Sequence, residues 1–587
     1  MSTAILTGPP VPGSSLEGDL RSLGFDVRSA ADTTEAVKLL DETPAGDRVA
    51  LVDPRFVGHL HSLRLGLTDP RFPAAAVPGA LTAQPEARAA LGRALRTAPG
   101  GPDAVAAALD AEGVAVQRPE LGSLVAAVPA DPAARGESER AVAAVDDEAI
   151  RLRTAVKSRD GFFTTYFISP YSRYIARWCA RRGLTPNQVT TASLITALIA
   201  AGCAATGTRG GYVAAGVLLL LSFVLDCTDG QLARYSLQYS TMGAWLDATF
   251  DRAKEYAYYA GLALGAIRGG DDVWALALGA MVLQTCRHVV DFSFNEANHD
   301  ATGNTSPTAA LSGKLDSVGW TVWVRRMIVL PIGERWAMIA VLTAVTTPRI
   351  VFYALLVGCA FAACYTTAGR VLRSVTRRAT RTDRAAQALA DLADSGPLAE
   401  WFRKGGPRFS GGFRAPVIAF LATGLLLAAA FERGGSWSFV GAAAFYAVLS
   451  GFALSGNLKG ALDWLVPPFF RVAEYCTILI LAVRADVPGA LPAAFGLVAA
   501  VAYHHYDTVY RIKGGTGAPP NWLVRAIGGQ EGRILLVAVL AALSTTIDFP
   551  LALTVLAVAV ALVVLAESIR FWVSSGAPAV HDEGETA

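Results

Sequence analysis

The sequence reads DCTDGQLARYSLQYSTMGAWLDATFD from Asp226 to Asp251 and contains four aspartates in two closely spaced pairs. Asp226 and Asp229 are three residues apart, and Asp247 and Asp251 are four residues apart. On an α-helix, these spacings place both members of a pair on one face. A long apolar run precedes the first pair and another follows the second. We therefore expect each pair to lie at the end of a membrane-spanning helix.

The connection between the two helices, residues 235–242, is short enough for an antiparallel hairpin that makes the acidic pairs face each other. Four carboxylates in a low-dielectric setting repel one another, and each intramembrane acid costs about 2.5 kcal/mol or more. Cations must neutralise them, and all-oxygen ligation favours two Mg²⁺ or Mn²⁺ ions. The alternative is a buried ion network with Arg234, Arg252 and Lys254.

Two glycines and an arginine in the same stretch fit a ligand site. Gly230 and Gly243 remove side chains where a bulky ligand must approach both helices. Arg234 offers a planar fork for phosphate or carboxylate.

The composition extends the membrane interpretation to most of the chain. Of the 587 residues, 53% are hydrophobic and only 17% are charged, which is too few charges for a soluble chain of this size. Nearly charge-free runs after residue 185 approach the ~20 residues that cross a bilayer. The expected fold is a mainly α, polytopic membrane helical bundle. Six spans are predicted at about 187–206, 211–235, 243–267, 272–294, 335–347 and 349–371, with about six more between 414 and 573.

Four segments are predicted along the chain. Residues 1–150 alternate β-like and helix-like runs and suggest a small soluble α/β domain. Residues 151–372 form the first membrane domain, which begins with an aromatic and arginine-rich interfacial helix near 161–182. A basic cytoplasmic linker at 373–413 leads to a second membrane block, 414–587, of unknown function. Arginines near 173–182, 325–326 and 370–378 fall on one side, which the positive-inside rule makes the cytoplasm.

Charge and cysteine usage exclude some partners and sites. The net charge of +2 comes without a basic stripe carrying interleaved aromatics, so no nucleic-acid partner is expected. The seven cysteines show no CxxC spacing and are interpreted as buried thiols.

The spacing D-x2-D-G-x2-A-R-x8-G-x3-D-x3-D resembles the signature of the CDP-alcohol phosphotransferases, and all of its fixed positions are present. The resemblance covers roughly 150–372 and includes the entry Leu184-Thr185-Pro186-Asn187-Gln188-Val189-Thr190. It implies that Asp226, Asp229, Asp247 and Asp251 bind metal and that Asp251 is also the general base. It further implies a nucleotide site lined by Asn187, Thr190, Gly230, Ala233, Arg234, Ser240 and Gly243.

The resemblance also implies a reaction and its setting. An acceptor alcohol attacks the β-phosphorus of a CDP-linked donor, and CMP leaves. The partners are then the donor, the acceptor and the lipid bilayer, with a homodimer through the spans common in the family. The expected location is a bacterial-type plasma membrane, with the active site and the N-terminal domain cytoplasmic. Phospholipid synthesis of the phosphatidylinositol-phosphate type is favoured, and a polar product from CDP-inositol is the nearest rival. The rival from another class is a transport or scaffold protein with an inactive core.

Three weaker groups of polar residues remain open. Arg287, His288 and Asp291 in the fourth span either bind the acceptor's phosphate or form an Arg287–Asp291 pair. In the second block, Arg471 and Glu474 favour a structural pair, and the run from His504 to Asp507 suggests a metal or acid–base site. That block resembles a C-terminal region attached to some phosphotransferases of the family.

The N-terminal segment raises one further resemblance. Some relatives that act on inositol phosphates carry a cytidylyltransferase domain ahead of the membrane part, and residues 153–173 resemble their junction. Thr7-Gly8-Pro9-Pro10 follows the first strand, yet it is not the Gly-rich, basic loop that cradles a triphosphate. We therefore expect a degenerate nucleotidyltransferase-like unit.

Overall fold

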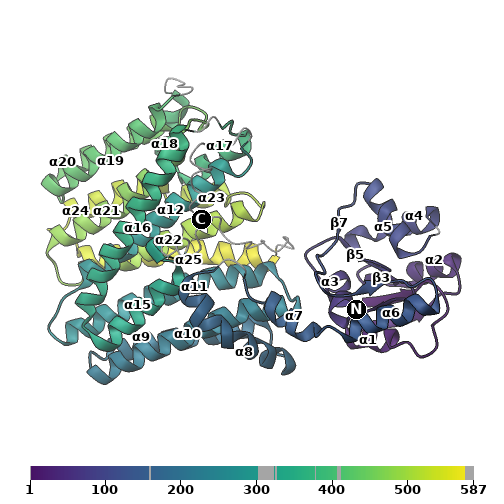
Figure 1. Cartoon of the computed structure of the whole chain (residues 1–587). Coiled ribbons are helices and arrows are strands. Elements are labelled where there is room, and N and C mark those ends of the chain that lie inside the picture. The colour runs from purple at the N-terminus through teal and green to yellow at the C-terminus, as the bar shows by residue number, and fades with distance from the viewer. Residues whose placement is uncertain are drawn as a thin grey trace.

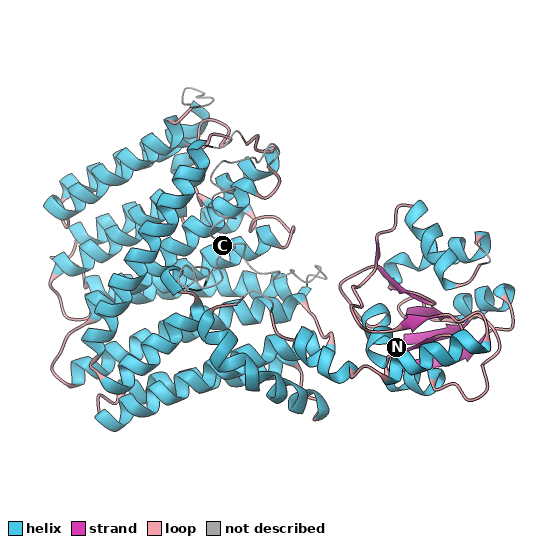
Figure 2. Cartoon of the chain, viewed as in Figure 1, coloured by secondary structure: helices cyan, strands magenta, loops and turns pink. Residues whose placement is uncertain are grey.

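The computed structural model describes residues 2–98, 100–157, 160–301, 323, 327–376, 379–405 and 412–574. Figure 1 shows a large helical bundle and a smaller α/β unit, which are joined through the short helix α7 (Asp147–Thr154). Figure 2 shows that the strands gather in the smaller unit.

The N-terminal unit is built on a six-stranded sheet of order β2-β1-β3-β6-β5-β7. The first strand is parallel to β2 and β3, β6 is antiparallel to β3 and β5, and β5 is parallel to β7. A two-stranded ladder joins β4 to β8. The strands are β1 (Ser2–Leu6), β2 (Phe25–Ser29), β3 (Arg48–Val52), β4 (Val57–Gly58), β5 (Ala74–Val77), β6 (Ala80–Ala83), β7 (Val116–Gln117) and β8 (Ala126–Ala127).

Both faces of this sheet are apolar because successive side chains of a strand point to opposite faces. In β1, Ile5 joins a core with α2, α4 and α5, whereas Ala4 and Leu6 join a second core with α1 and α3. The helices are α1 (Leu16–Ser22), α2 (Thr33–Glu42), α3 (Leu60–Leu67), α4 (Arg88–Thr97), α5 (Pro102–Ala111) and α6 (Pro132–Ala143). The predicted α/β character is confirmed.

One strand pairing in this unit was not predicted from the sequence. The segment 69–79 is rich in proline and glycine, which suggests a break, yet β5 and β6 form a tight hairpin there. Gly79 has φ +79°, a conformation that glycine adopts without steric cost, and Pro78 precedes it in the two-residue turn.

Over its described residues, the first membrane domain has six helices at the six predicted spans. They are α9 (Pro186–Ala205), α10 (Arg209–Ser236), α11 (Thr241–Arg268), α12 (Trp274–Asn298), α15 (Ile332–Val345) and α16 (Pro348–Thr376). Both α10 and α11 pack against α9. Ahead of them, a π-helical turn (Thr164–Ile168) leads into α8 (Ser169–Arg181). Exposed Tyr171, Tyr174 and Trp178 lie on α8 among arginines, as expected of an interfacial helix.

The second block adds the helices α19 (Arg414–Arg433), α20 (Trp437–Ala453), α21 (Val466–Ala485), α22 (Ala490–Lys513), α23 (Asn521–Ala526), α24 (Gly529–Ala542) and α25 (Phe549–Ser574). Of these, α21, α22 and α25 pack on α11 or α12 of the first domain. Part of the expected linker is helical too: α17 (Asp383–Leu392) packs on α12, and α18 (Pro397–Gly405) packs on α20. Their apolar faces bury Leu389, Leu392 and Ala399, which explains why these residues do not remain a free linker.

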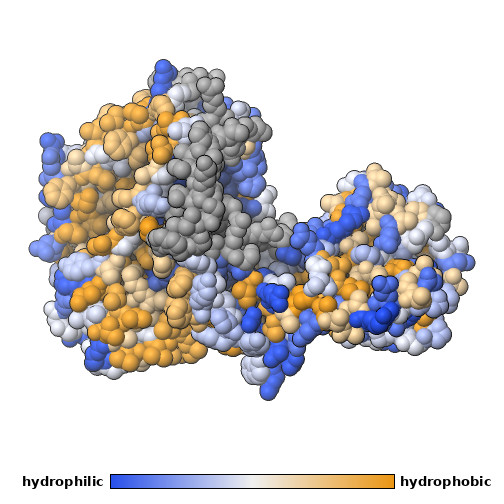
Figure 3. Space-filling view, in the orientation of Figure 1, coloured by the Kyte–Doolittle hydropathy of each residue, from blue (hydrophilic) through white to orange (hydrophobic). Residues whose placement is uncertain are grey.

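The surface identifies an integral membrane protein. Figure 3 shows apolar side chains spread over the helical bundle. Among the described residues, every large exposed apolar side chain lies at or after Tyr166. In the described part of the chain, six helices are long and apolar enough to cross a membrane: α9, α10, α16, α19, α25, and α21 with the turn before it, Asp463–Ala485. The predicted polytopic helical class is therefore confirmed.

Candidate active site

The α10–α11 turn positions the aspartates. Helix α10 ends at Ser236, and Leu237 adopts the left-handed conformation (φ 52°) that terminates it. Ser240 caps α11 by accepting a hydrogen bond from the Gly243 amide at 2.9 Å. Both helices extend into the expected connection, so the turn is only Leu237–Ser240. Each acidic pair consequently lies on a regular helix close to the turn.

The hairpin brings the carboxylates together as the spacing predicts. Ligand oxygens of Asp226, Asp229 and Asp247 all lie within 4.8 Å of one another. Asp251 joins them through Lys254, whose Nζ lies 3.0 Å from Asp251 Oδ1 and also pairs with Asp226. Lys254 further donates to Ser193 Oγ at 3.1 Å and is 1% exposed. The four acids thus form one cluster with a buried ammonium at its centre.

The donor set fits hard divalent cations. Four carboxylates against one lysine leave a formal charge of −3 at a buried position, which is costly without further cations. Asp229 Oδ2 is buried and has no hydrogen-bond partner among the described residues, so it is open to a ligand. Carboxylate oxygens of this kind are what Mg²⁺ and Mn²⁺ prefer.

The alternative of a closed ion network holds for Lys254, which pairs with Asp226 and Asp251, and in part for Arg252, whose charge acts on Asp251. Arg252 bonds Glu255 at 2.9 Å, and the Nε of Arg234 donates to the Ala155 carbonyl at 2.6 Å. One lysine does not neutralise four acids, so a cation site accounts for the cluster better.

The predicted nucleotide-site residues gather at the same end of the helices. A Cβ on Gly243 would lie 2.8 Å from both Asn187 Oδ1 and Ser240 Oγ, so a larger residue here would displace these two side chains. The Thr190 hydroxyl lies beside Asp229 and donates to Pro186 O at 3.0 Å.

The remaining residues of the motif lie on α10. A Cβ on Gly230 would meet only the Arg234 guanidinium, at 3.5 Å or more, which leaves this face open to a ligand. The Ala233 carbonyl accepts from the Gln238 amide at 3.0 Å and closes the end of α10.

The N-terminal unit docks at the same end, which the sequence did not indicate. The Arg151 Nε donates to the Tyr235 carbonyl at 2.7 Å, and its guanidinium lies 3.5 Å from the centre of the Tyr235 ring. Arg71 stacks at 4.0 Å on Tyr239 of the α10–α11 turn. Beside this contact, burial and the charges of Arg151 and Arg64 lower the pKa of His61 to about 4.

A second polar cluster begins at Arg252, the residue after Asp251, and includes the predicted acceptor residues. We call it the cluster behind Asp251. Its members are Arg252, Glu255, Arg287, His288, Asp291, Arg335, Arg370 and Tyr506. Asp291 pairs with Arg370 of α16 instead of Arg287. Arg287 bonds the Val329 carbonyl, while its Nε and Nη1 are buried without a hydrogen-bond partner among the described residues. His288 bonds Gln284 Nε2 at 2.6 Å and the hydroxyl of Tyr506.

Three further residues of this cluster were missed from the sequence. Glu255 receives hydrogen bonds from Arg252 at 2.9 Å, from Tyr259 at 2.7 Å and from Arg335 at 3.3 Å. The spacing of three between Arg252 and Glu255 was an available signal. Arg335 begins a predicted span, and Tyr506 belongs to the second block, so no local pattern joins either of them to Asp251.

The polar motifs of the second block form ion pairs. Arg471 bonds Glu474 at 2.7 Å, and both join Arg533 and Asp394 in a buried network. His504 bonds Asp394 at 3.0 Å, whereas Asp507 accepts from Trp572 at 2.7 Å. The His504–Asp507 run therefore connects to two separate partners. Among the described residues, the aspartates of α10 and α11 form the one group with metal-ligand spacing.

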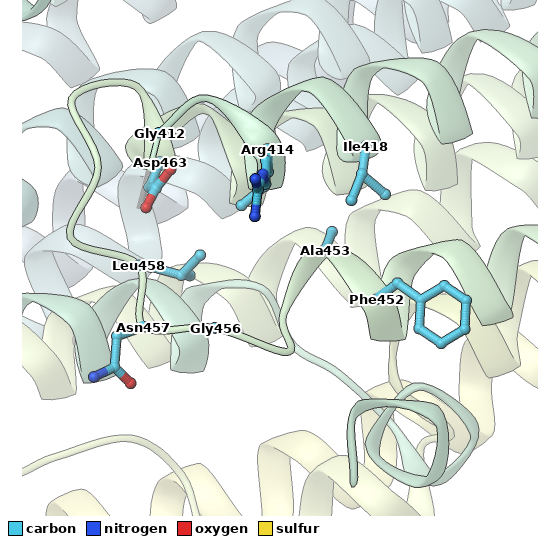
Figure 4. Close-up of a pocket in the computed structure, with 10 residues that line it drawn as sticks. Gly412, Arg414, Ile418, Phe452, Ala453, Gly456, Asn457, Leu458 and Asp463 are labelled. Carbon is cyan, nitrogen blue, oxygen red and sulfur yellow. The ribbon is translucent and has the colours of Figure 1, made fainter. Parts of the chain in front are cut away.

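The second block also contains a small cavity (Figure 4) between the start of α19 and the connection from α20 to α21. Arg414, Ile418, Phe452 and Asp463 are among its lining residues, and none of the predicted site residues lines it.

Comparisons with known proteins match two separate parts of the chain. The family model for CDP-alcohol phosphatidyltransferase matches residues 183–371, and a family of unknown function, DUF5941, matches 383–587.

Curated relatives match part of the chain. A phosphatidylinositol phosphate synthase of Streptomyces avermitilis is 32% identical over 21% of this chain and 51% of its own length. An archaetidylinositol phosphate synthase of Pyrococcus horikoshii is 30% identical over 19% and 58%, respectively. A bifunctional IPC transferase and DIPP synthase of Thermococcus kodakarensis is 32% identical over 21% and 27%. The chain thus spans about half the length of the first two relatives. The similarity to the CDP-alcohol phosphatidyltransferase family therefore covers residues 183–371, which is less than half of the chain.

Proposed function

We propose that this chain transfers a phosphate-linked group from a CDP-alcohol donor to an acceptor hydroxyl and releases CMP. The observation that carries the proposal is the meeting of Asp226, Asp229 and Asp247 within 4.8 Å, beside Asn187 and Gly243. The family of residues 183–371 supports it, as do the synthase names of the relatives.

In this proposal, all four aspartates bind the cations, and Asp251 also accepts a proton. Two divalent cations held by the four aspartates would neutralise the pyrophosphate and the charge that develops on the leaving CMP. Asp251 accepts the proton of the acceptor hydroxyl, and the resulting oxygen attacks the β-phosphorus of the donor. The bond from that phosphorus to the CMP oxygen breaks, so CMP leaves with the electron pair. The Lys254 ammonium lies 3.0 Å from Asp251 Oδ1 and holds this side chain beside the other aspartates.

The charge behind Asp251 favours a phosphorylated acceptor. Four arginines (Arg252, Arg287, Arg335 and Arg370) face two acids (Glu255 and Asp291), which gives a formal charge of +2 in a mostly buried cluster. Two buried nitrogens of Arg287 have no hydrogen-bond partner among the described residues. A phosphate dianion would satisfy both the charge and the free donors. An inositol phosphate acceptor, as the names of the relatives suggest, has this group.

The setting completes the proposal. The docked N-terminal unit, the arginines of α8 and the aspartates lie at one end of the bundle, and we place this end in the cytoplasm by the positive-inside rule. Association of two copies through the spans stays a prediction.

The direct test is release of CMP by the purified chain with Mg²⁺ across a panel of CDP donors and acceptor alcohols. We expect release with a CDP-linked lipid and an inositol phosphate, and a loss of at least 1,000-fold in Asp251→Asn. Asp272→Asn, at an exposed position before α12, is the control and should keep full activity. A transport or scaffold protein with an inactive core would release no CMP with any pair, although both variants fold.

A further inference from the structure

We propose that the second membrane block completes the acceptor site of the phosphotransferase domain, and that Tyr506 is the positioning residue it contributes. The inference rests on the proposed function in one respect, namely that the cluster behind Asp251 binds the acceptor's phosphate. It assigns a role to the block that matches a family of unknown function.

The two membrane domains share an extensive contact at the helices of the site. Helix α22 packs on α11 and α12, α21 packs on α12, and α25 packs on α11. Trp572 of α25 stacks on Trp245, and the two ring centres are 6.2 Å apart. Trp245 lies two residues before Asp247, which is one of the predicted metal ligands. The second block therefore covers the helices that hold the predicted metal ligands and the acceptor cluster.

Tyr506 is the residue of α22 that enters the acceptor cluster. Its hydroxyl bonds His288 Nδ1, and its ring lies 5.3 Å from the guanidinium of Arg252. The ring also meets His288 and Phe292 edge-on, at 5.7 and 6.1 Å. Tyr506 is 4% exposed, so it forms a buried wall of the cluster.

The partners of Tyr506 are the groups that a phosphate needs. Arg252 directly follows Asp251, and its Nη1 lies 3.5 Å from the His288 ring nitrogen that Tyr506 bonds. The tyrosine thus fixes the arginine and the histidine together, next to the general base. Its ring also excludes water, which strengthens the attraction between the arginines and a phosphate.

The residues around Tyr506 hold it in place from within the second block. His504 bonds Asp394 of the buried ion network, and Asp507 accepts hydrogen bonds from Ser568 and Trp572 of α25 at 2.8 and 2.7 Å. Arg511 adds an ion pair to Asp507 at 2.8 Å. The run from His504 to Asp507 is therefore an anchored segment that presents Tyr506 to the first domain.

The test compares Tyr506→Phe with Tyr446→Phe in the full chain in detergent. Tyr446 is a matched control, because it is a buried tyrosine whose hydroxyl bonds one side chain, Gln530, at 2.7 Å within the second block. Two measurements are made: the thermal shift caused by inositol 1-phosphate or inorganic phosphate, and the KM values for donor and acceptor in CMP release.

We expect Tyr506→Phe to weaken inositol 1-phosphate binding and to raise the acceptor KM by at least 10-fold. The donor KM and the Mg²⁺ dependence should stay within two-fold of the unaltered chain, and Tyr446→Phe should leave all of these values unchanged. Equal effects of the two variants, equal changes in donor and acceptor KM, or no binding of either phosphate probe would overturn the inference. If the chain binds the phosphate through Tyr506 but releases no CMP, the inference stands and the proposed function fails.

Discussion

At the residue scale, the central feature is Lys254, which bridges Asp226 and Asp251 inside the acidic cluster. Removing one partner of a buried pair leaves uncompensated charge, which costs about 3 kcal/mol or more. We predict that Lys254→Met destabilises the metal-free chain by about this amount. Because added Mg²⁺ then relieves a larger repulsion, the Mg²⁺-induced rise in Tm should exceed that of the unaltered chain.

Thermal unfolding in EDTA and in Mg²⁺ checks this prediction. Lys459→Met, at a half-exposed lysine that pairs with Asp383, is the control and should change neither value. An unchanged Mg²⁺ effect in Lys254→Met would show that the cations bind elsewhere.

The sequence predicts that the aspartates lie close together, because their spacings follow helical geometry. Spacings of three and four place Asp226 with Asp229, and Asp247 with Asp251, on one helix face each. The short turn between the helices then brings the two pairs together. The acceptor cluster was predicted only in part. Its remaining members, Glu255, Arg335 and Tyr506, come from three different helices, and only tertiary packing brings them together.

At the scale of elements, α3 and α7 join the N-terminal unit to the turn of the active site. His61 of α3 is 3% exposed, and neither of its ring nitrogens has a hydrogen-bond partner among the described residues. Burial and the nearby Arg151 and Arg64 lower its pKa to about 4, compared with 6.5 in the unfolded chain.

This shift sets the direction of a pH dependence. Between pH 6.5 and about 4 the unfolded chain binds a proton at His61 that the folded chain does not, so stability falls on acidification through this window. From pH 7 to pH 5 we expect a loss of about 2 kcal/mol that His61→Leu does not show. Scanning calorimetry of both proteins at the two pH values measures the difference. A parallel decline of both would contradict this role of His61.

The elements themselves were predictable to different degrees. Helices α9 to α12, α15 and α16 lie at the predicted spans because each needs a long apolar face. The β5–β6 hairpin was missed because the Pro78-Gly79 turn suggests a break rather than a pairing. Helices α17 and α18 were missed because their polar faces dominate the composition of 373–413.

At the scale of the whole molecule, the buried network around Asp394 holds the second block together. Asp394 lies between α17 and α18 and receives bonds from His504, Arg471 and Arg533, which come from three helices. We predict that Asp394→Asn destabilises the chain by about 3 kcal/mol or more, because two buried arginines lose a counter-charge. Asp383→Asn, at an exposed side chain at the start of α17, is the control in thermal unfolding. Equal stability of the two variants would contradict this role.

The arrangement of the two membrane domains was not predictable from sequence. Each domain has its own apolar helices, and their hydropathy does not predict that α22 packs on α11 and α12. The contact depends on single pairs such as Tyr506 with His288 and Trp572 with Trp245.

The most direct test of the account is a titration of the full chain with CMP in the presence of Mg²⁺ or EDTA. If the carboxylates of α10 and α11 hold cations against a cytidine nucleotide, CMP binds in Mg²⁺, loses at least 10-fold in affinity in EDTA, and loses the Mg²⁺ effect in Asp226→Asn and Asp247→Asn. Equal binding of CMP in Mg²⁺ and EDTA, or an Mg²⁺ effect that survives both substitutions, would contradict the account.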